Sequence, residues 1–343
     1  MYSFQNDYSE GAHPRILKAL VESNLVQTEG YGLDPYSQQA TEILKQRLGN
    51  QNVDIHFLMG GTQANIVALS AFLKPYEAVI STHEGHIYTH EAGSIEATGH
   101  KVISIYSQNG KLDVQMIDKV VKEHHGDDHM VIPRLVYISN STELGTNYTK
   151  QELVALREYC NAHDLLLYMD GARLGAALTS TRNDVAFADL CNLFDAFYIG
   201  ATKTGAFNGE AVVIVNDSLK PNFRRNIRQH GAMVAKSKTI AIQFIELFKD
   251  ELYLKLASHS NKMSAMIKQG FIDAGYSLFI DSFTNQQFPI IPNQLLAKFD
   301  EKYLTSIWCP YDENHTVIRF VTSWATKEAN VLELIEDMKK FKE

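Results

Sequence analysis

Short apolar runs alternate with helix-periodic segments through much of the chain. The apolar runs have the length of strands and cover residues 55–58, 78–81, 102–105, 134–138, 165–169, 195–199 and 211–215. Apolar residues at helical spacing predict helices between several of them, over residues 62–73, 113–124 and 150–163. This alternation indicates a mostly parallel sheet flanked by helices, and such sheets bind ligands beyond the carboxyl ends of their strands.

Towards the amino terminus, the sequence predicts helices and a turn without the strand-like runs of the central region. Helical spacing predicts one helix over residues 13–24, with Pro14 early in it, where a helix tolerates proline. A turn-rich piece at 30–35 follows, and then a second helix that runs through Ala40 and Leu48. We expect residues 1–24 to form an N-terminal arm.

The pattern also changes after the last apolar run. A long helical pattern covers residues 236–274, with a break expected near Glu251. After Gly275 the chain has short strand patterns at 277–280 and 316–321 and a closing helix pattern at 327–341. A length of 343 residues exceeds the usual size of one domain. We therefore expect a large α/β domain over 25–240 and a small α+β domain over 241–343.

Composition narrows the class of protein. A hydrophobic content of 45% and a net charge of −8 describe a soluble globular chain and argue against binding to nucleic acid or to an anionic membrane. The amino terminus lacks the pattern of a signal peptide, and no apolar run is long enough to span a bilayer. Three cysteines are too few and too scattered for a disulfide framework or a zinc site. These features predict a cytoplasmic protein.

A carboxylate and an amine each follow a predicted strand. Asp170 ends the run 165–169, and Lys203 directly follows 196–202. A buried lysine has a lowered pKa that leaves its amine nucleophilic, and buried charges need partners. The pair suits a pyridoxal phosphate ring, in which the lysine forms an imine with the aldehyde and the aspartate keeps the pyridine nitrogen protonated. Taken singly, Lys203 also fits a solvated loop and Asp170 a turn with Gly171.

A glycine-rich turn precedes the helix predicted over residues 62–73. Its glycines, Gly60 and Gly61, allow close backbone approach, and the helix N-terminus offers free N–H groups to a phosphate. Thr62 adds a hydroxyl at the capping position, and Thr202 is a second hydroxyl for the same phosphate. An ordinary strand-to-helix turn also uses Gly-Gly-Thr, so the motif alone leaves that interpretation open.

Histidines and arginines add weaker signals. The segment 83–91 misses the zinc-protease pattern, because Ile87 stands where that pattern has a glutamate, and we expect no metal. His86 fits an imidazole stacked on the cofactor ring. Arg173 suits the ring edge or a substrate carboxylate. Arg319, in an apolar strand pattern, either points to solvent or clamps a substrate α-carboxylate.

With these residues in place, the chain resembles the threonine aldolase and β-eliminating lyase family of fold-type-I pyridoxal phosphate enzymes. The resemblance spans nearly the whole chain and is carried by Tyr31-Gly32-Leu33-Asp34-Pro35, Gly61-Thr62-Gln63-Ala64-Asn65, His86-Ile87-Tyr88 with Glu91-Ala92-Gly93, Asp170-Gly171-Ala172-Arg173, Thr202-Lys203 and Ile318-Arg319-Phe320-Val321-Thr322. It implies the aspartate aminotransferase fold, with a large pyridoxal phosphate-binding domain built on a mostly parallel seven-stranded sheet and a small C-terminal domain. It also implies a homodimer or homotetramer with shared active sites.

The same resemblance implies roles for individual residues. Lys203 would be the Schiff-base lysine, Asp170 the partner of the pyridine nitrogen and His86 the stacking imidazole. The remaining cofactor contacts would come from Gly61, Thr62, Arg173 and Thr202. Substrate contacts would come from Asn6, Tyr31, Thr142, Arg173 and Arg319, with Tyr31 contributed by a neighbouring subunit.

Three departures from the family pattern lie near the substrate. The stretch 139–143 reads Ser-Asn-Ser-Thr-Glu where aldolases of the family usually have Glu-Asn-Thr-His-Asn, so Thr142 stands in place of a second histidine. Asn6 replaces a usual serine, and the stretch 231–234 lacks a usual arginine. The departures leave the substrate less well specified than the cofactor.

These features predict an aldehyde-lyase that uses pyridoxal phosphate. It would cleave the Cα–Cβ bond of β-hydroxy-α-amino acids, turning L-threonine or L-allo-threonine into glycine and acetaldehyde. Either His86 or an ordered water would take the β-hydroxyl proton. Two alternatives remain: another reaction of the same cofactor with an amino acid (β-elimination, transamination or racemisation), and cofactor binding without catalysis.

Overall fold

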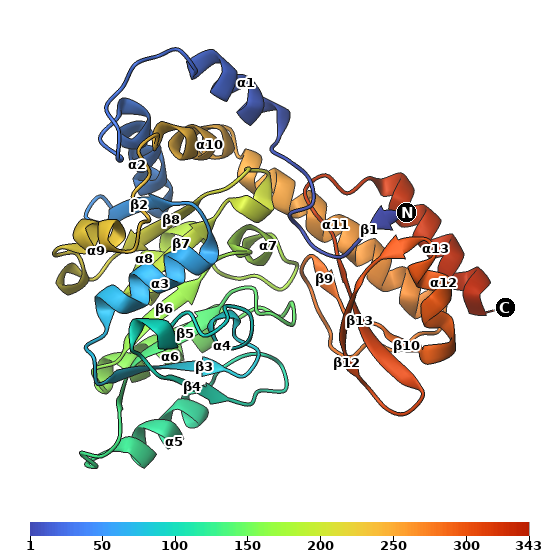
Figure 1. Ribbon diagram of the computed structural model, residues 1–343. Helices are drawn as coiled ribbons and strands as arrows, with labels where there is room; N and C mark the ends of the chain where they lie inside the picture. Colours follow the sequence, from blue (N-terminus) through green and yellow to red (C-terminus); the bar gives the residue numbers. More distant parts are fainter. Residues whose placement is uncertain (343) are drawn as a thin grey trace.

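A seven-stranded sheet forms the centre of the large unit in the computed structural model, which describes residues 1–342 (Figure 1). Its strand order is β2-β8-β7-β6-β5-β3-β4. The strands are β2 (Asp54–Leu58), β3 (Glu77–Thr82), β4 (Val102–Ile105), β5 (Ile132–Ser139), β6 (Leu166–Asp170), β7 (Ala196–Gly200) and β8 (Glu210–Ile214). Only β8 runs antiparallel to its neighbours among the strands of this sheet. The seven predicted strands are confirmed to within two residues at each end.

Alternation of side chains along the strands builds two hydrophobic layers. Val136 and Ile138 of β5 face a core completed by α2 (Pro35–Leu48), α5 (Val114–His124), α6 (Lys150–Ala162), α8 (Leu190–Leu193) and α10 (Lys238–Phe248). Leu135 and Tyr137 face the opposite layer, which α3 (Gly61–Phe72) and α9 (Phe223–Gln229) cover. Cys160 is buried in the first layer, as a small hydrophobic residue.

Two helices connect the large unit to the small one. The expected break between α10 and α11 (Leu252–Asp273) is confirmed at Glu251, whose φ is +60°. The core of the large sheet includes Ile240 and continues to Leu256, past the boundary that we expect at residue 240. No helix within residues 1–342 has the length and hydropathy to cross a membrane.

The small unit packs helices against a short antiparallel sheet of order β10-β13-β12 (Figure 1). Its elements are β9 (Gln286–Gln287), β10 (Ile290–Pro292), α12 (Leu296–Asp300), β12 (Ser306–Pro310), β13 (His315–Val321) and α13 (Glu328–Lys342). The strand expected over 277–280 is wrong, because in the described structure this segment makes only an isolated bridge, from Leu278 to Pro289.

The N-terminal arm reaches both units. Its first strand, β1 (Tyr2–Ser3), pairs with β11 (Tyr303–Leu304) of the small unit, and its helix α1 (Pro14–Ser23) packs beside α10 (Figure 1). Residues between β1 and α1 therefore pass between the two units, which brings Asp7 and Tyr8 to the carboxyl edge of the large sheet.

Candidate active site

Asp170 and Lys203 meet at the carboxyl edge of the large sheet. Asp170 is the last residue of β6, and Lys203 lies in the short turn 202–204 that follows β7. Because β6 and β7 are parallel neighbours, both side chains line one cavity of about 200 Å³. The lining residues are Tyr8, Met59, Gly60, Gly61, Thr62, His86, Glu143, Asp170, Ala172, Tyr198, Thr202, Lys203 and Glu210.

Asp170 is held by four donors. Tyr137 and Tyr198 each donate a hydroxyl at 2.5 Å, Asn65 donates Nδ2 at 3.1 Å, and the main-chain N–H of Ala172 donates at 3.0 Å. Burial alone raises the pKa of a carboxyl, but the charge of His86 and the tyrosine bonds lower the pKa of Asp170 below its ordinary value. Asp170 is therefore an ionised carboxylate, suited to hold a proton on a pyridine nitrogen.

Lys203 carries a free amine. Within residues 1–342 its side chain has no hydrogen bond or ion pair, although it lines the same cavity as Asp170. Desolvation lowers the pKa of Lys203, and the nearby charge of Arg173 lowers it further. A lowered pKa increases the fraction of neutral, nucleophilic amine.

The glycine turn before α3 offers an anion site. Gly60 is the N-cap of α3 and supplies no capping side chain, so the first N–H groups of the helix have no side-chain acceptor from the cap. A Cβ on Gly61 would lie 2.8 Å from the hydroxyl oxygen of Tyr198, so only glycine fits there without movement of the tyrosine. The turn therefore has both the donors and the space for a phosphate at one end of the cavity.

His86 is oriented by a buried glutamate. It is the first residue of α4 (His86–Thr89), and its Nδ1 lies 2.9 Å from Oε1 of Glu91. Desolvation lowers the pKa of His86, but the bond to Glu91 and the charges of Glu143 and Asp170 raise it above its ordinary value overall. A more basic imidazole is protonated over a wider pH range, which favours the expected stacking role over that of a proton acceptor.

Thr202 uses its hydroxyl within the chain. It donates to Oε1 of Glu210 at 2.7 Å and accepts from the main-chain N–H of Gly209 at 3.1 Å. Burial raises the pKa of Glu210 to about 8, against the opposing effects of the Thr202 bond and the Lys203 charge. The proton of the Thr202 hydroxyl is thus directed to Glu210 rather than into the cavity.

Glu210→Gln is expected to flatten the pH dependence of the free energy of unfolding. Between the ordinary pKa of 4.5 and about 8, the folded state holds a proton on Glu210 that the unfolded state releases. Stability of the wild-type protein therefore falls as pH rises, by up to about 1.4 kcal/mol per pH unit from this group. Urea denaturation of the cofactor-free proteins from pH 4 to 9 measures the difference. If the unfolding free energies of wild type and Glu210→Gln changed with pH at equal slopes, the prediction would be contradicted. The pH-dependent difference between the two unfolding free energies should be smallest at the acid end of the range.

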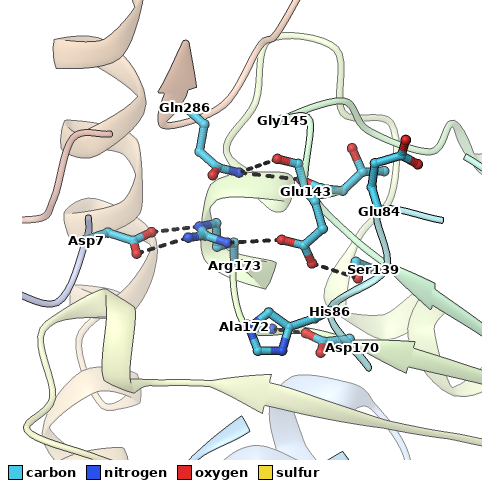
Figure 2. A network of polar contacts seen from close by, with 12 residues as sticks. Asp7, Glu84, His86, Ser139, Glu143, Gly145, Asp170, Ala172, Arg173 and Gln286 are labelled. Carbon is cyan, nitrogen blue, oxygen red and sulfur yellow. Dashed lines mark hydrogen bonds and ion pairs between the residues drawn. The ribbon is translucent and has the colours of Figure 1, made fainter. Parts of the chain in front are cut away.

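Arg173 is paired before any ligand binds. It donates Nε to Oδ2 of Asp7 at 2.7 Å and Nη2 to Oδ1 at 3.2 Å, while its Nη1 lies 3.8 Å from Oε2 of Glu143 (Figure 2). Burial opposes ionisation of Asp7, but the charges of Arg173 and Lys203 lower the pKa of Asp7 to about 2. Asn285 of the small unit also donates to Asp7, at 2.8 Å. The ion pair thereby connects the arm, the large unit and the small unit.

Arg319 is a cation without a carboxylate partner in the described chain. It lies on β13, its Nε is buried without a hydrogen bond among the described residues, and its guanidinium lies 5.9 Å from the ring centre of Trp308. Burial lowers the pKa of Arg319, as does the charge of Arg173. Its position beside Arg173 suits a carboxylate that enters from outside.

None of the five predicted substrate residues is among the residues that line this cavity; Arg173 and Arg319 make the contacts given above, and the other three are engaged elsewhere. Asn6 caps the next turn by accepting from Tyr8 and Ser9. The Thr142 hydroxyl bonds Thr146 at 2.7 Å. Tyr31 is 42% exposed, and the guanidinium of Arg228 lies 5.3 Å from its ring centre.

Several residues of the site were missed by the sequence reasoning. Glu143 lies four residues after the end of β5, in the loop at the same edge of the sheet where β6 ends with Asp170, so the strand-end rule points to this loop but not to Glu143 itself. Glu210 begins a strand, and it reaches the carboxyl edge only because β8 is antiparallel. The sequence around three further residues contains no motif that points to the site: Asp7, Tyr137 and Tyr198. Each has a polar group in a buried position, and such a group needs a hydrogen-bond partner.

The arrangement fits pyridoxal phosphate. An ionised carboxylate, a free amine and an uncapped helix N-terminus with space at Gly61 all border one cavity. Residues 1–342 contain no cluster of three or more His, Cys, Asp or Glu side chains that would hold a metal ion.

Comparisons with known proteins agree with this arrangement. A low specificity L-threonine aldolase from Pseudomonas aeruginosa is 28% identical over 98% of this chain and 96% of its own length. The solved structure of threonine aldolase from Leishmania major is 46% identical, with a TM-score of 0.98 over 99% of both chains. An aromatic aminotransferase from Pyrococcus horikoshii has the same fold, with 18% identity and a TM-score of 0.71 over 99% of this chain and 95% of its own.

The family model for β-eliminating lyases matches residues 11–317, a range that includes both Asp170 and Lys203. The motif-based resemblance and the expected aminotransferase fold are thereby confirmed. The chain belongs to the β-eliminating lyase family, whose members depend on pyridoxal phosphate.

Proposed function

We propose that this protein is a pyridoxal phosphate-dependent aldehyde-lyase that cleaves L-threonine or L-allo-threonine to glycine and acetaldehyde. The observation that carries the proposal is the cavity in which ionised Asp170 and the free amine of Lys203 lie together. The near-identical fold and substantial identity of the threonine aldolase from Leishmania major support the same reaction class.

Each side of the cavity has a separate task toward the cofactor. When bound, pyridoxal phosphate supplies an electron sink for a bond broken at Cα. Lys203 Nζ would attach to its aldehyde carbon, and Asp170 would keep a proton on its ring nitrogen. The N–H groups at the start of α3, with Thr62, would hold its phosphate. His86, fixed by Glu91, would cover one face of its ring.

The substrate carboxylate is assigned to Arg319. Arg173 has two of its donors committed to Asp7, whereas Arg319 has no ion pair among the described residues. A guanidinium presents two parallel donors to a carboxylate, and such charge-assisted pairs are strong where water is excluded.

We also propose that the active unit is a homodimer. Tyr31 was expected to come from a neighbouring subunit, and it is exposed, beside Arg224 and Arg228 on the outer surface of the large unit. An exposed aromatic residue packed against arginines is a common feature of protein interfaces. A pairing of two chains through this surface would present Tyr31 to the partner's cavity.

Product analysis tests the proposed reaction. The purified protein with added pyridoxal phosphate is expected to release equal amounts of aldehyde and glycine from L-threonine or L-allo-threonine. Serine, cysteine and alanine are assayed beside them, for pyruvate, keto acid and racemised product. Turnover of one of these amino acids with no aldehyde from either threonine would overturn the proposal in favour of another reaction. Spectral binding of amino acids with no product from any of them would indicate a non-catalytic protein.

A further inference from the structure

Glu143 is a carboxylate of the cavity for which the proposed function has so far provided no task. It lies in the loop after β5, is 8% exposed and lines the same cavity as Lys203, His86 and Asp170. Its negative charge acts on two of these neighbours, raising the pKa of His86 and opposing the fall in the pKa of Lys203. Figure 2 shows its carboxylate between Arg173 and Ser139, above His86 and Asp170.

The main chain of Glu143 is fixed, but its carboxylate is only weakly bonded. Gln286 of the small unit donates to its carbonyl oxygen at 3.4 Å, and Thr284 donates to that of Gly145 at 3.1 Å. The carboxylate itself accepts only a long bond of 3.3 Å from the Ser139 hydroxyl, and Nη1 of Arg173 is 3.8 Å away, beyond hydrogen-bond range. A buried carboxylate with this much free acceptor capacity calls for a further donor.

The other titratable groups of the cavity are less suited to accept a proton. Asp170 already accepts four hydrogen bonds. Glu210 holds its own proton up to about pH 8, because burial raises its pKa. His86 has a raised pKa and directs Nδ1 to Glu91. Glu143 is the remaining acidic side chain that lines the cavity, and it can receive a donor from the substrate.

We propose that Glu143 is the catalytic base that takes the β-hydroxyl proton of the substrate, an assignment that rests on the proposed function. The proton passes to a carboxylate oxygen of Glu143, and the electron pair of the O–H bond becomes the second C–O bond of the aldehyde. The Cα–Cβ bond breaks with its electron pair left on Cα, for which bound pyridoxal phosphate would supply the electron sink. The proton that Glu143 accepted would then pass, directly or through solvent, to Cα to give glycine, which restores the ionised carboxylate with no net gain or loss of protons.

The assignment also explains selection of the substrate class. An amino acid with a β-hydroxyl donates a hydrogen bond to Glu143 as it binds through its carboxylate. An amino acid such as alanine has no donor at Cβ and leaves the buried carboxylate unsatisfied, which costs binding free energy. Glu143 therefore both positions the scissile Cα–Cβ bond and accepts the proton.

Two reactions of the protein with bound pyridoxal phosphate, cleavage of threonine and exchange of the glycine Cα proton, distinguish a catalytic role of Glu143 from a structural role. Glu143→Gln keeps the side-chain shape and an acceptor for Ser139 but cannot take the proton. We expect kcat for L-threonine cleavage to fall by about 10²- to 10⁴-fold, while exchange of the glycine Cα proton in D₂O stays within about threefold of wild type. Glycine exchange uses the same cofactor and lysine but involves no β-hydroxyl. It is followed by NMR.

Further variants guard against an effect on folding. Glu77→Gln is the matched control: Glu77 is 7% exposed, accepts from the main-chain N–H of Lys74 and lies at the amino end of β3, away from the cavity. We expect it to leave both reactions unchanged. Glu143→Asp keeps a carboxylate one methylene shorter and is expected to recover part of the cleavage rate.

The results that overturn the assignment are distinct. Equal losses of cleavage and glycine exchange in Glu143→Gln would show that Glu143 positions the cofactor instead. Unchanged cleavage would show that another group takes the proton. In both cases the proposed function stands. A wild-type protein that exchanges glycine but releases no aldehyde from either threonine would overturn the proposed function, and the assignment of Glu143 with it.

Discussion

Replacing Lys203 by alanine is expected to abolish turnover of threonine and covalent attachment of pyridoxal phosphate. The variant loses the desolvated amine that shares a cavity with Asp170 and that makes no hydrogen bond or ion pair within residues 1–342. Removal of a group that acts covalently lowers kcat by on the order of 10⁴-fold or more. Loss of the visible absorption of lysine-bound cofactor and loss of aldehyde release are the two measurements.

Stability separates this effect from misfolding. The pKa of Lys203 is lowered, so burial of its charged form costs free energy in the folded state, and alanine removes that cost. The cofactor-free Lys203→Ala protein should therefore unfold at a temperature no lower than wild type. Lys203→Arg keeps a charge without a nucleophile and should also be inactive, while Lys339→Ala, exposed on α13, should match wild type. Normal turnover by Lys203→Ala would refute the covalent role.

Asp170→Asn is expected to lower both activity and stability. All four partners of Asp170 are donors, so the amide nitrogen of asparagine must face at least one of them. A buried donor left without an acceptor costs about 1–3 kcal/mol of unfolding free energy. Loss of the negative charge removes the partner that keeps the pyridine nitrogen protonated, which should lower kcat by on the order of 10²- to 10³-fold. Urea denaturation and aldehyde release measure the two effects.

Asp195 provides the matched control. It lies just before β7, at the opposite edge of the sheet, and accepts from Arg157 at 2.6 Å, from the main-chain N–H of Leu167 at 2.7 Å and from Asn216 at 2.9 Å. Asp195→Asn should cost a similar free energy of unfolding and leave kcat nearly unchanged. If the two variants lost activity equally, destabilisation rather than the charge at the ring nitrogen would account for the effect.

Much of the site was predictable because parallel strands impose a local rule. The sequence placed Asp170 and Lys203 at strand ends, and adjacent parallel strands bring their carboxyl ends to one edge. The glycine turn before α3 followed from the same rule, since β2 runs parallel to these strands. His86 was singled out from the histidine-rich segment 83–91, and the family motif implies the same stacking role for it.

Contacts between distant segments escaped prediction. The bond between Arg173 and Asp7 joins residues 166 positions apart, and that between Asn285 and Asp7 joins residues 278 positions apart. Such pairs leave no periodic pattern in the sequence, because the residues around each partner have the composition of an ordinary loop. Thr142 drew attention as the departure from the family pattern, whereas the next residue, Glu143, carries the side chain that reaches the cavity.

The sequence by itself determined the order of strands and helices, the cofactor class, and the lysine and aspartate that would hold the cofactor. These depend on burial periodicity and on residue type at strand ends, both of which are local. Only the tertiary structure decided which carboxylates face the cavity and in which state each one is. Asp170 accepts hydrogen bonds from the hydroxyls of two tyrosines, and burial raises the pKa of Glu210 to about 8. The carboxylate of Glu143 accepts only one long hydrogen bond, from Ser139. Those states depend on desolvation and on donors brought in from other segments, including a strand, β8, whose direction the chain reveals only on folding.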